Sequence, residues 1–246
     1  MVVLELIREL RETLYDISDT GEPPAGSGCK YYWEYDDSDL IWKNAELLRY
    51  LNAAGDELAL RVPIHDSGRS SVTRVAVRPG TDRYHISPRI LAIDDVLLES
   101  DRSPLENLSG ADEYNSRYDG ERRYASPRGI RCYRSDFDER VLTVYDAPLA
   151  ADTLLLSVRR YPIEPLRWES RACQEPEFPE HCQRSMVDWA ASLAYRKRDS
   201  DKFNIDLAQY HQGQFAASTG PQIDFRAARV RGEIAGRRVR TRTQYY

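Results

Sequence analysis

Apolar residues recur at helical spacing near the start of the chain. They fall three or four positions apart, with charged residues between them, at Val3, Ile7, Leu10, Leu14 and Ile17. This spacing places them on one face of an amphipathic helix, which we expect to run for about five turns. The segment 21–35, which is rich in proline and glycine, is predicted to be a loop.

A second helix is predicted to begin near Asp37 and to end before Pro63. Asp37 or Ser38 can cap its start, and Asp39 favours its first turn, because their oxygens accept from the free amides there. Its apolar positions repeat at helical spacing at Ile41, Ala45, Leu48, Leu51, Leu58 and Val62. Two long helices are therefore expected to open the chain.

From Val72 the apolar period changes to two, which is typical of strands. Segments of strand length, rich in β-branched and aromatic residues, follow at 84–86, 89–98, 130–134, 141–145 and 154–161. We expect a β-rich insertion over residues 70–162, with a sandwich or barrel of antiparallel type. Residues 100–129 are polar and are predicted to form a long loop, which in compact domains is usually functional or mobile.

Helical spacing returns after the proline-bearing segment 162–179. A third helix is predicted from Glu180 to Arg198. One face of it carries Cys182, Met186, Trp189, Ala190 and Leu193.

The last predicted helix is bounded by polar residues at its start and by a glycine at its end. Asp199 or Ser200 is expected to cap it, and Gly220 followed by Pro221 is expected to stop it. Its apolar face is predicted to consist of Phe203, Leu207, Tyr210 and Phe215.

The four helices predict one bundle, because neither helix pair can bury its apolar stripe alone. The predicted fold class is α+β: a bundle of about four helices with an inserted antiparallel β-rich lobe and an extended C-terminal arm. The predicted parts are an N-terminal helical part at 1–69, the β-rich lobe at 70–162, a C-terminal helical part at 163–221 and the arm at 222–246.

The C-terminal arm concentrates positive charge on an otherwise acidic chain. Its last 21 residues hold seven of the 35 basic residues and one of the 40 acidic ones, a local charge of +6 against −11 for the rest. The arginines are Arg226, Arg229, Arg231, Arg237, Arg238, Arg240 and Arg242, and the chain ends with Tyr245 and Tyr246. With few apolar residues, the arm is expected to be mobile until a partner orders it.

Three interpretations of the arm follow from its chemistry. Arginine forks suit the phosphates of nucleic acid, with the two terminal tyrosines stacking on bases. They suit equally the carboxylates of an acidic protein groove, on which the arm would order. A purely solubilising end is the third interpretation.

Composition and pattern exclude several classes of protein. The longest apolar runs are far shorter than the roughly 20 residues needed to cross a bilayer, so no membrane span is expected. Charged residues interrupt the N-terminal apolar positions, unlike in a secretory signal. The four cysteines form no CxxC pair, so neither a disulfide framework nor a zinc knuckle is expected.

The histidines predict no metal or nucleophile site. His65, His85, His181 and His211 lie far apart in the sequence, and His181 alone has a neighbouring cysteine, Cys182. Adjacent residues on a helix point about 100° apart, so one helix cannot direct both at one metal. We expect a surface histidine and a buried cysteine.

No other residues predict catalysis. Neither GxGxxG nor GxxxxGK occurs, so no phosphate loop is expected. Acidic residues do lie close together, as Asp36 with Asp37, Asp94 with Asp95 and Asp136 with Asp138. Two carboxylates can hydrolyse a sugar bond, but close neighbours are more often solvated loop residues or helix starts. The sequence predicts no catalytic residue and no cofactor.

Three stretches, in this order, carry a family resemblance. The first is the N-terminal helix followed by residues 35–57 (YDDSDLIWKNAELLRYLNAAGDE). The second is residues 80–93 (GTDRYHISPRILAI) with the later strands 141–148 and 154–162, and the third is residues 178–220, which include LAYRKRDSD at 193–201. Together they resemble the head-to-tail connector or adaptor proteins of tailed bacteriophages, in the group that includes tail tubular protein A. The arm is not part of the pattern that these stretches share.

The resemblance implies a structural protein of the virion, assembled in the host cytoplasm. It implies a homo-oligomeric ring, usually twelvefold, below the portal, with the helical bundle as its wall and the arm engaging the portal protein. A tail or nozzle protein, and tail fibres, are the partners on the other side, and genomic DNA passes through the lumen. The leading hypothesis is therefore a structural adaptor that is not an enzyme.

Two other hypotheses stay open. The arm could serve a nucleic-acid-binding protein, although the acidic body argues against an extended DNA surface. A cell-wall hydrolase is the third hypothesis, because some relatives have been linked to that activity, but no residues here are expected to carry it.

Overall fold

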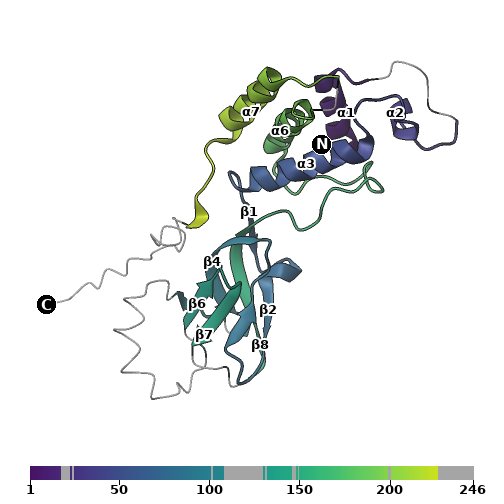
Figure 1. Cartoon of the computed structure of the whole chain (residues 1–246). Coiled ribbons are helices and arrows are strands. Elements are labelled where there is room, and N and C mark those ends of the chain that lie inside the picture. Colours follow the sequence, from purple (N-terminus) through teal and green to yellow (C-terminus); the bar gives the residue numbers. More distant parts are fainter. Residues whose placement is uncertain are drawn as a thin grey trace. The chain divides into compact units, whose positions relative to one another are not determined.

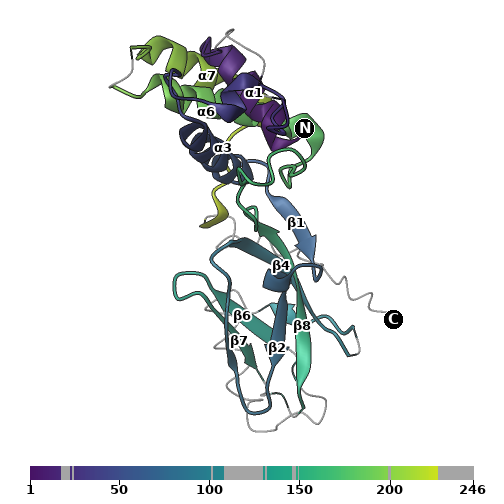
Figure 2. The same cartoon turned by 90° about the vertical axis from the view of Figure 1, so that its right-hand side faces the viewer.

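Figure 1 shows the computed structural model of the chain, and Figure 2 shows it after a quarter turn. The structure describes residues 1–17, 23, 25–100, 102–107, 130, 132–145, 148, 150–198 and 201–226. They fall into two compact units. The helical unit consists of Met1–Ile64 and Pro162–Ile223, and the β unit contains His65–Tyr161 with the described residues from Asp224 on.

The predicted fold class, α+β with a helical bundle and a β-rich insertion, is confirmed. The helices are α1 (Val3–Leu14), α2 (Tyr32–Tyr35), α3 (Asn44–Ala59), α5 (Glu180–Gln183), α6 (Ser185–Tyr195) and α7 (Ile205–Thr219). Among the described residues no helix has the length and apolar character needed to span a membrane.

Helix α6 lies at the centre of the helical unit. It packs against α1, α3 and α7, so helices from both ends of the chain share one core (Figure 1). Its sequence is apolar or small almost all round, which is typical of a helix surrounded by others. Its alanines, Ala190, Ala191 and Ala194, are fully buried and let the neighbouring helices approach closely.

A buried arginine ties α1 to the loop before α3. Arg11 is fully buried, and its Nη1 lies 2.9 Å from Asp16 Oδ2. Its Nη2 donates to the Trp42 carbonyl at 3.0 Å and to Asn44 Oδ1 at 2.7 Å. Asp16 also accepts from the backbone amides of Ile41 and Trp42. Burial lowers the pKa of Arg11, and the carboxylate of Asp16 acts in the opposite direction.

The predicted helix starts and ends are partly wrong. α1 ends at Leu14, where Tyr15 turns left-handed at φ 51°, so Ile17 lies beyond it. α3 begins at Asn44 rather than near Asp37, whose Oδ2 accepts from the Asn44 amide at 2.7 Å across an intervening loop. The short helix α2 lies within the predicted loop.

The predicted apolar face of the last helix is also wrong. Asn204 caps α7 by accepting from the amides of Asp206 and Leu207, whereas Asp199 and Ser200 lie outside the described residues. Ala208 and Phe215 are buried. The other predicted members are exposed: Phe203 by 47%, Leu207 by 39% and Tyr210 by 59%. α7 therefore turns a narrow row of residues toward α6 and leaves most of the expected stripe in solvent.

The β unit is built from short strands. They are β1 (Ile64–Ser67), β2 (Arg74–Val77), β3 (Arg83–His85), β4 (Ile90–Leu98), β5 (Glu106–Asn107), β6 (Cys132–Asp136), β7 (Val141–Tyr145) and β8 (Asp152–Arg160). In one sheet β8 pairs with β1, β2 and β4, and the other sheet has the order β3-β7-β6-β5. Figure 2 shows β8 extending along the length of β2 and β1.

The two sheets enclose one core, as a sandwich does. One hydrophobic cluster contains Val77, Ile93 and Leu154 from the first sheet and Tyr133 and Leu142 from the second. The prediction of antiparallel strands holds for the long strands, but β5 pairs with β6 in parallel. A strand of two residues has no period to detect, which is why the pattern missed both β5 and its direction.

Candidate functional site

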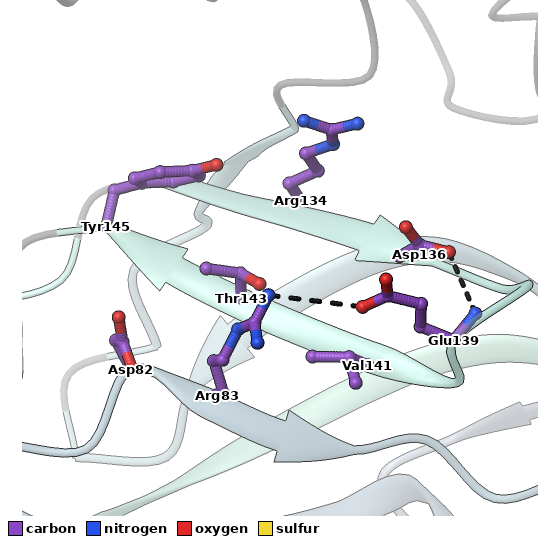
Figure 3. A pocket seen from close by; sticks show the side chains of 8 residues that line it. All are labelled: Asp82, Arg83, Arg134, Asp136, Glu139, Val141, Thr143 and Tyr145. Carbon is purple, nitrogen blue, oxygen red and sulfur yellow. Dashed lines mark hydrogen bonds and ion pairs between the residues drawn. The ribbon is translucent and has the colours of Figure 1, made fainter.

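The outer face of the second sheet carries a polar hollow of about 380 Å³ (Figure 3). Strand β7 forms its floor, because successive residues of a strand point to opposite faces. Leu142 and Val144 are buried in the core, so Val141, Thr143 and Tyr145 point outward. The hollow is lined by Asp82, Arg83, Arg134, Asp136, Glu139, Val141, Thr143 and Tyr145.

Strand register brings two arginines to this face. Arg83 of β3 and Arg134 of β6 are both paired with Thr143, one on each side of β7. Their side chains therefore stand on the same face of the sheet, as Figure 3 shows. Sequence reasoning missed the hollow, because the sequence does not reveal which residues of three strands lie opposite one another.

Two of the acids of the hollow, Asp136 and Glu139, are engaged within the β unit. Glu139 Oε2 lies 4.0 Å from Arg83 Nη2, and Asp136 Oδ1 accepts from the backbone amides of Asp138 and Glu139 at 3.0 Å each (Figure 3). A glycosidase needs one free acid and one free carboxylate across the bond. Arg134, in contrast, is exposed and has no polar partner among the described residues. The hollow therefore presents charged side chains of both signs, and Asp136 and Glu139 are not arranged as a catalytic pair.

The other acidic pairs also have structural roles. Asp94 accepts two hydrogen bonds from Arg159, through Nε at 3.1 Å and Nη2 at 2.8 Å. Asp36 accepts from the backbone amide of Ser38, and this bond lowers the pKa of Asp36. Neither residue is arranged as half of a catalytic pair.

The surroundings of the histidines and cysteines are those of ordinary surface and core residues. His181 is exposed and Cys182 is buried, as predicted, and burial raises the pKa of the Cys182 thiol. His211 Nδ1 lies 3.1 Å from Asp188 Oδ1, and its ring stacks on Tyr195. In the part of the chain that the structure describes, no group of three or more potential ligands could hold a metal ion.

The start of the arm is anchored on the end of α3. The carbonyl of Gly220, which ends α7 at φ 79°, accepts from Arg61 Nη1 at 2.6 Å, and the Ile223 amide donates to the Leu60 carbonyl at 2.8 Å. Arg226 follows shortly and is exposed. The other predicted partner-binding residues, Arg229, Arg231, Arg237, Arg238, Arg240, Arg242, Tyr245 and Tyr246, lie outside the described residues.

Comparison with known proteins identifies a family over nearly the whole chain. The family model described as SU10 adaptor protein matches residues 1–242. No curated protein matches the chain.

Proposed function

The chain belongs to the SU10 adaptor protein family and is therefore a structural phage adaptor rather than an enzyme; from this premise we propose that it forms a ring beneath the portal of a tailed phage. The ring, twelvefold in the proposal, joins the portal to a tail or nozzle protein and to tail fibres. Genomic DNA passes through its lumen. Adaptor function implies binding to other virion components, and the portal is the partner that we assign to the arm.

The extent of the family match supports a role for the arm. It runs to residue 242, so all seven arginines fall inside the family sequence and Tyr245 and Tyr246 fall outside it. The resemblance of separate stretches had left the arm out, and the family match corrects that. Inclusion in the family sequence supports a role for the arm beyond that of an appended solubilising end.

Charge explains why a protein groove is the favoured partner of the arm. The last 21 residues carry +6 and the remaining chain −11, so a ring of these bodies presents DNA with negative charge, along which the duplex slides without sticking. Arginine forks bind carboxylates in two-point geometry, so an acidic groove on the portal fits the arm. Anchoring of Gly220 and Ile223 gives the arm a fixed starting point on the body.

Truncation tests the role of the arm. A chain that ends at Phe225 lacks all seven arginines and should keep its folded body but lose binding to the portal protein in a pull-down. A variant with lysine at the seven positions keeps the charge without the forks, and we expect it to bind more weakly than the natural chain. Unchanged binding by the truncated chain would show that the arm has no part in docking.

The same variants test the nucleic-acid alternative. If the arm binds DNA, the affinity of the full chain should fall about 1,000-fold or more between low and moderate salt, because about six or more phosphate contacts release counterions. A gel shift with duplex DNA measures this, with the truncated chain as control. Absence of a shift at low salt removes the alternative, whereas a salt-sensitive shift combined with no portal binding replaces the portal proposal.

A further inference from the structure

Large apolar side chains are exposed at one end of the helical unit. Within the described part of the chain, all the strongly exposed ones belong to this unit, and none belongs to the β unit. They are Tyr15 (85% exposed), Ile17 (42%), Phe203 (47%), Ile205 (46%), Leu207 (39%) and Tyr210 (59%), which we call the α7 patch.

A lysine brings the two parts of the patch together. Lys202 Nζ donates to the carbonyls of Leu14 and Tyr15, at 2.9 and 2.5 Å. Phe203, the next residue, therefore lies close to the turn that carries Tyr15. The two parts of the α7 patch, at the end of α1 and in the first turns of α7, are thus held near each other.

Charge is sparse along α7. Asp206 is the one charged side chain among its 15 residues, whereas the 12 residues of α1 include five charged side chains. Each copy of the chain carries a net charge of −5, so two copies repel each other unless they meet where charge is low. Cores of protein interfaces are likewise enriched in aromatic residues and depleted of charge.

The size of the patch also fits an interface. The exposed parts of its three aromatic rings amount to roughly 400 Å² of surface, taking about 200 Å² for a whole aromatic side chain. A standard specific interface takes about 800 Å² from each partner. The rings alone therefore supply about half of what one side of a stable contact needs.

We propose that the α7 patch packs against a second copy of this chain. The inference rests on the proposed ring, because a closed ring requires each subunit to contact identical neighbours. In such a ring the patch of one subunit faces a different surface of the next, so that one kind of contact repeats around the circle.

Two charges placed in the patch test this directly. Phe203→Glu with Leu207→Glu, in the full chain, should lower the self-association constant about 100-fold or more, because desolvated anchor positions dominate interface affinity. Position 207 lies in the first turn of α7 after the cap Asn204, where an acid favours the helix, so the change should not weaken folding. The control is Ala45→Glu with Ala53→Glu, which adds the same charge at exposed positions of α3.

Sedimentation velocity over a wide concentration range measures the outcome, with circular dichroism as a check that each variant is folded. We expect the natural chain and the α3 control to grow in mass with concentration and the patch variant to stay monomeric. A natural chain that stays monomeric, or a patch variant that associates like the control, overturns the inference.

Binding to the portal separates this inference from the proposed function. If the patch variant associates normally and still docks on the portal, the inference fails while the adaptor role stands. If the natural chain associates through the patch but does not bind the portal, the contact between copies stands while the portal role fails. Loss of portal binding by the patch variant, with the natural chain monomeric, assigns the patch to the portal instead.

Discussion

The helical unit and the β unit treat their apolar side chains differently. In the β unit, the large apolar residues that the structure describes lie inside the sandwich or are partly covered, and the outer face of its second sheet carries a polar hollow. The helical unit, in contrast, leaves the α7 patch exposed. A unit that buries its apolar residues needs no partner to keep them from water. An exposed cluster of large apolar side chains, in contrast, marks a surface that a partner covers.

The largest effect should come from removing the buried arginine of the helical unit. Arg11→Ala leaves Asp16 and Asn44 buried without their partner and should lower the free energy of unfolding by about 3–5 kcal/mol. Tryptophan fluorescence in urea measures it, since all four tryptophans lie in this unit. Arg8→Ala is the control: Arg8 is half exposed beside Glu12, and its loss should leave stability nearly unchanged, because solvent screens exposed ion pairs. Equal losses from both would contradict the structural role of Arg11.

A core substitution in the β unit should follow. Leu142 is fully buried on β7, between β3 and β6, and Leu142→Ala should lower stability by about 2–4 kcal/mol. The neighbouring Thr143 points outward, so Thr143→Ala should have an effect of about 0.5 kcal/mol or less. Amide hydrogen exchange of the β3 and β6 backbone measures both. Faster exchange in the Thr143 variant than in the Leu142 variant would refute the assigned faces of the strand.

The buried ion pair of the β unit predicts a dependence on pH. Asp66 Oδ2 accepts a hydrogen bond from Arg160 Nε at 2.8 Å. Burial acts to raise the pKa of Asp66, but hydrogen bonds from Ser70, Arg160 and the Arg69 amide outweigh burial, so the pKa lies below its ordinary value. Since the folded pKa lies below the ordinary value of 3.8, the pair stabilises the fold above that pH. Its contribution is lost as the pH falls through the folded pKa.

Asp66→Asn should therefore lower stability by about 2 kcal/mol at neutral pH and flatten its fall below pH 4. Hydrogen exchange of the β unit in urea at a series of pH values measures how steeply the free energy of unfolding falls with pH. An unchanged slope in the variant would assign the acid sensitivity to other carboxylates.

The smallest effect should come from the α7 patch itself. Leu207→Ser removes an exposed apolar side chain and should change the stability of the monomer by about 0.5 kcal/mol or less. Phe215→Ala, on the buried row of the same helix, should lower it by about 3–5 kcal/mol. A large loss of stability at position 207 would mean that the patch supports the fold and not a contact with another chain.

The spacing of apolar residues correctly predicted those helices and strands that bury one face against a core. The spacing at Val3, Ile7, Leu10 and Leu14 predicted α1, and the run at 141–145 predicted β7 with its bounds. Both elements bury one side against a core, so their apolar residues mark the buried face. The same reasoning was wrong for α7, where most of the apolar stripe is exposed. Helical spacing groups apolar residues on one face, but it does not show whether another part of the same chain covers that face.

The site was less predictable than the fold. The polar hollow depends on which residues of β3, β6 and β7 lie opposite one another, and the register of those strands is set by the whole sandwich. The start of a helix also depended on contacts across a loop: the Asp37 carboxylate accepts a hydrogen bond from the backbone amide of Asn44, seven residues later. Of the predicted arginine site, Arg226 is described and exposed, and the remaining residues stay a prediction.

Electron microscopy of the full chain mixed with its portal protein tests the central claim most directly. The account predicts a ring of this chain bound on the tail side of the portal, and a bare portal when the chain ends at Phe225. A portal that remains bare beside the full chain, at concentrations where both proteins are folded, would contradict it.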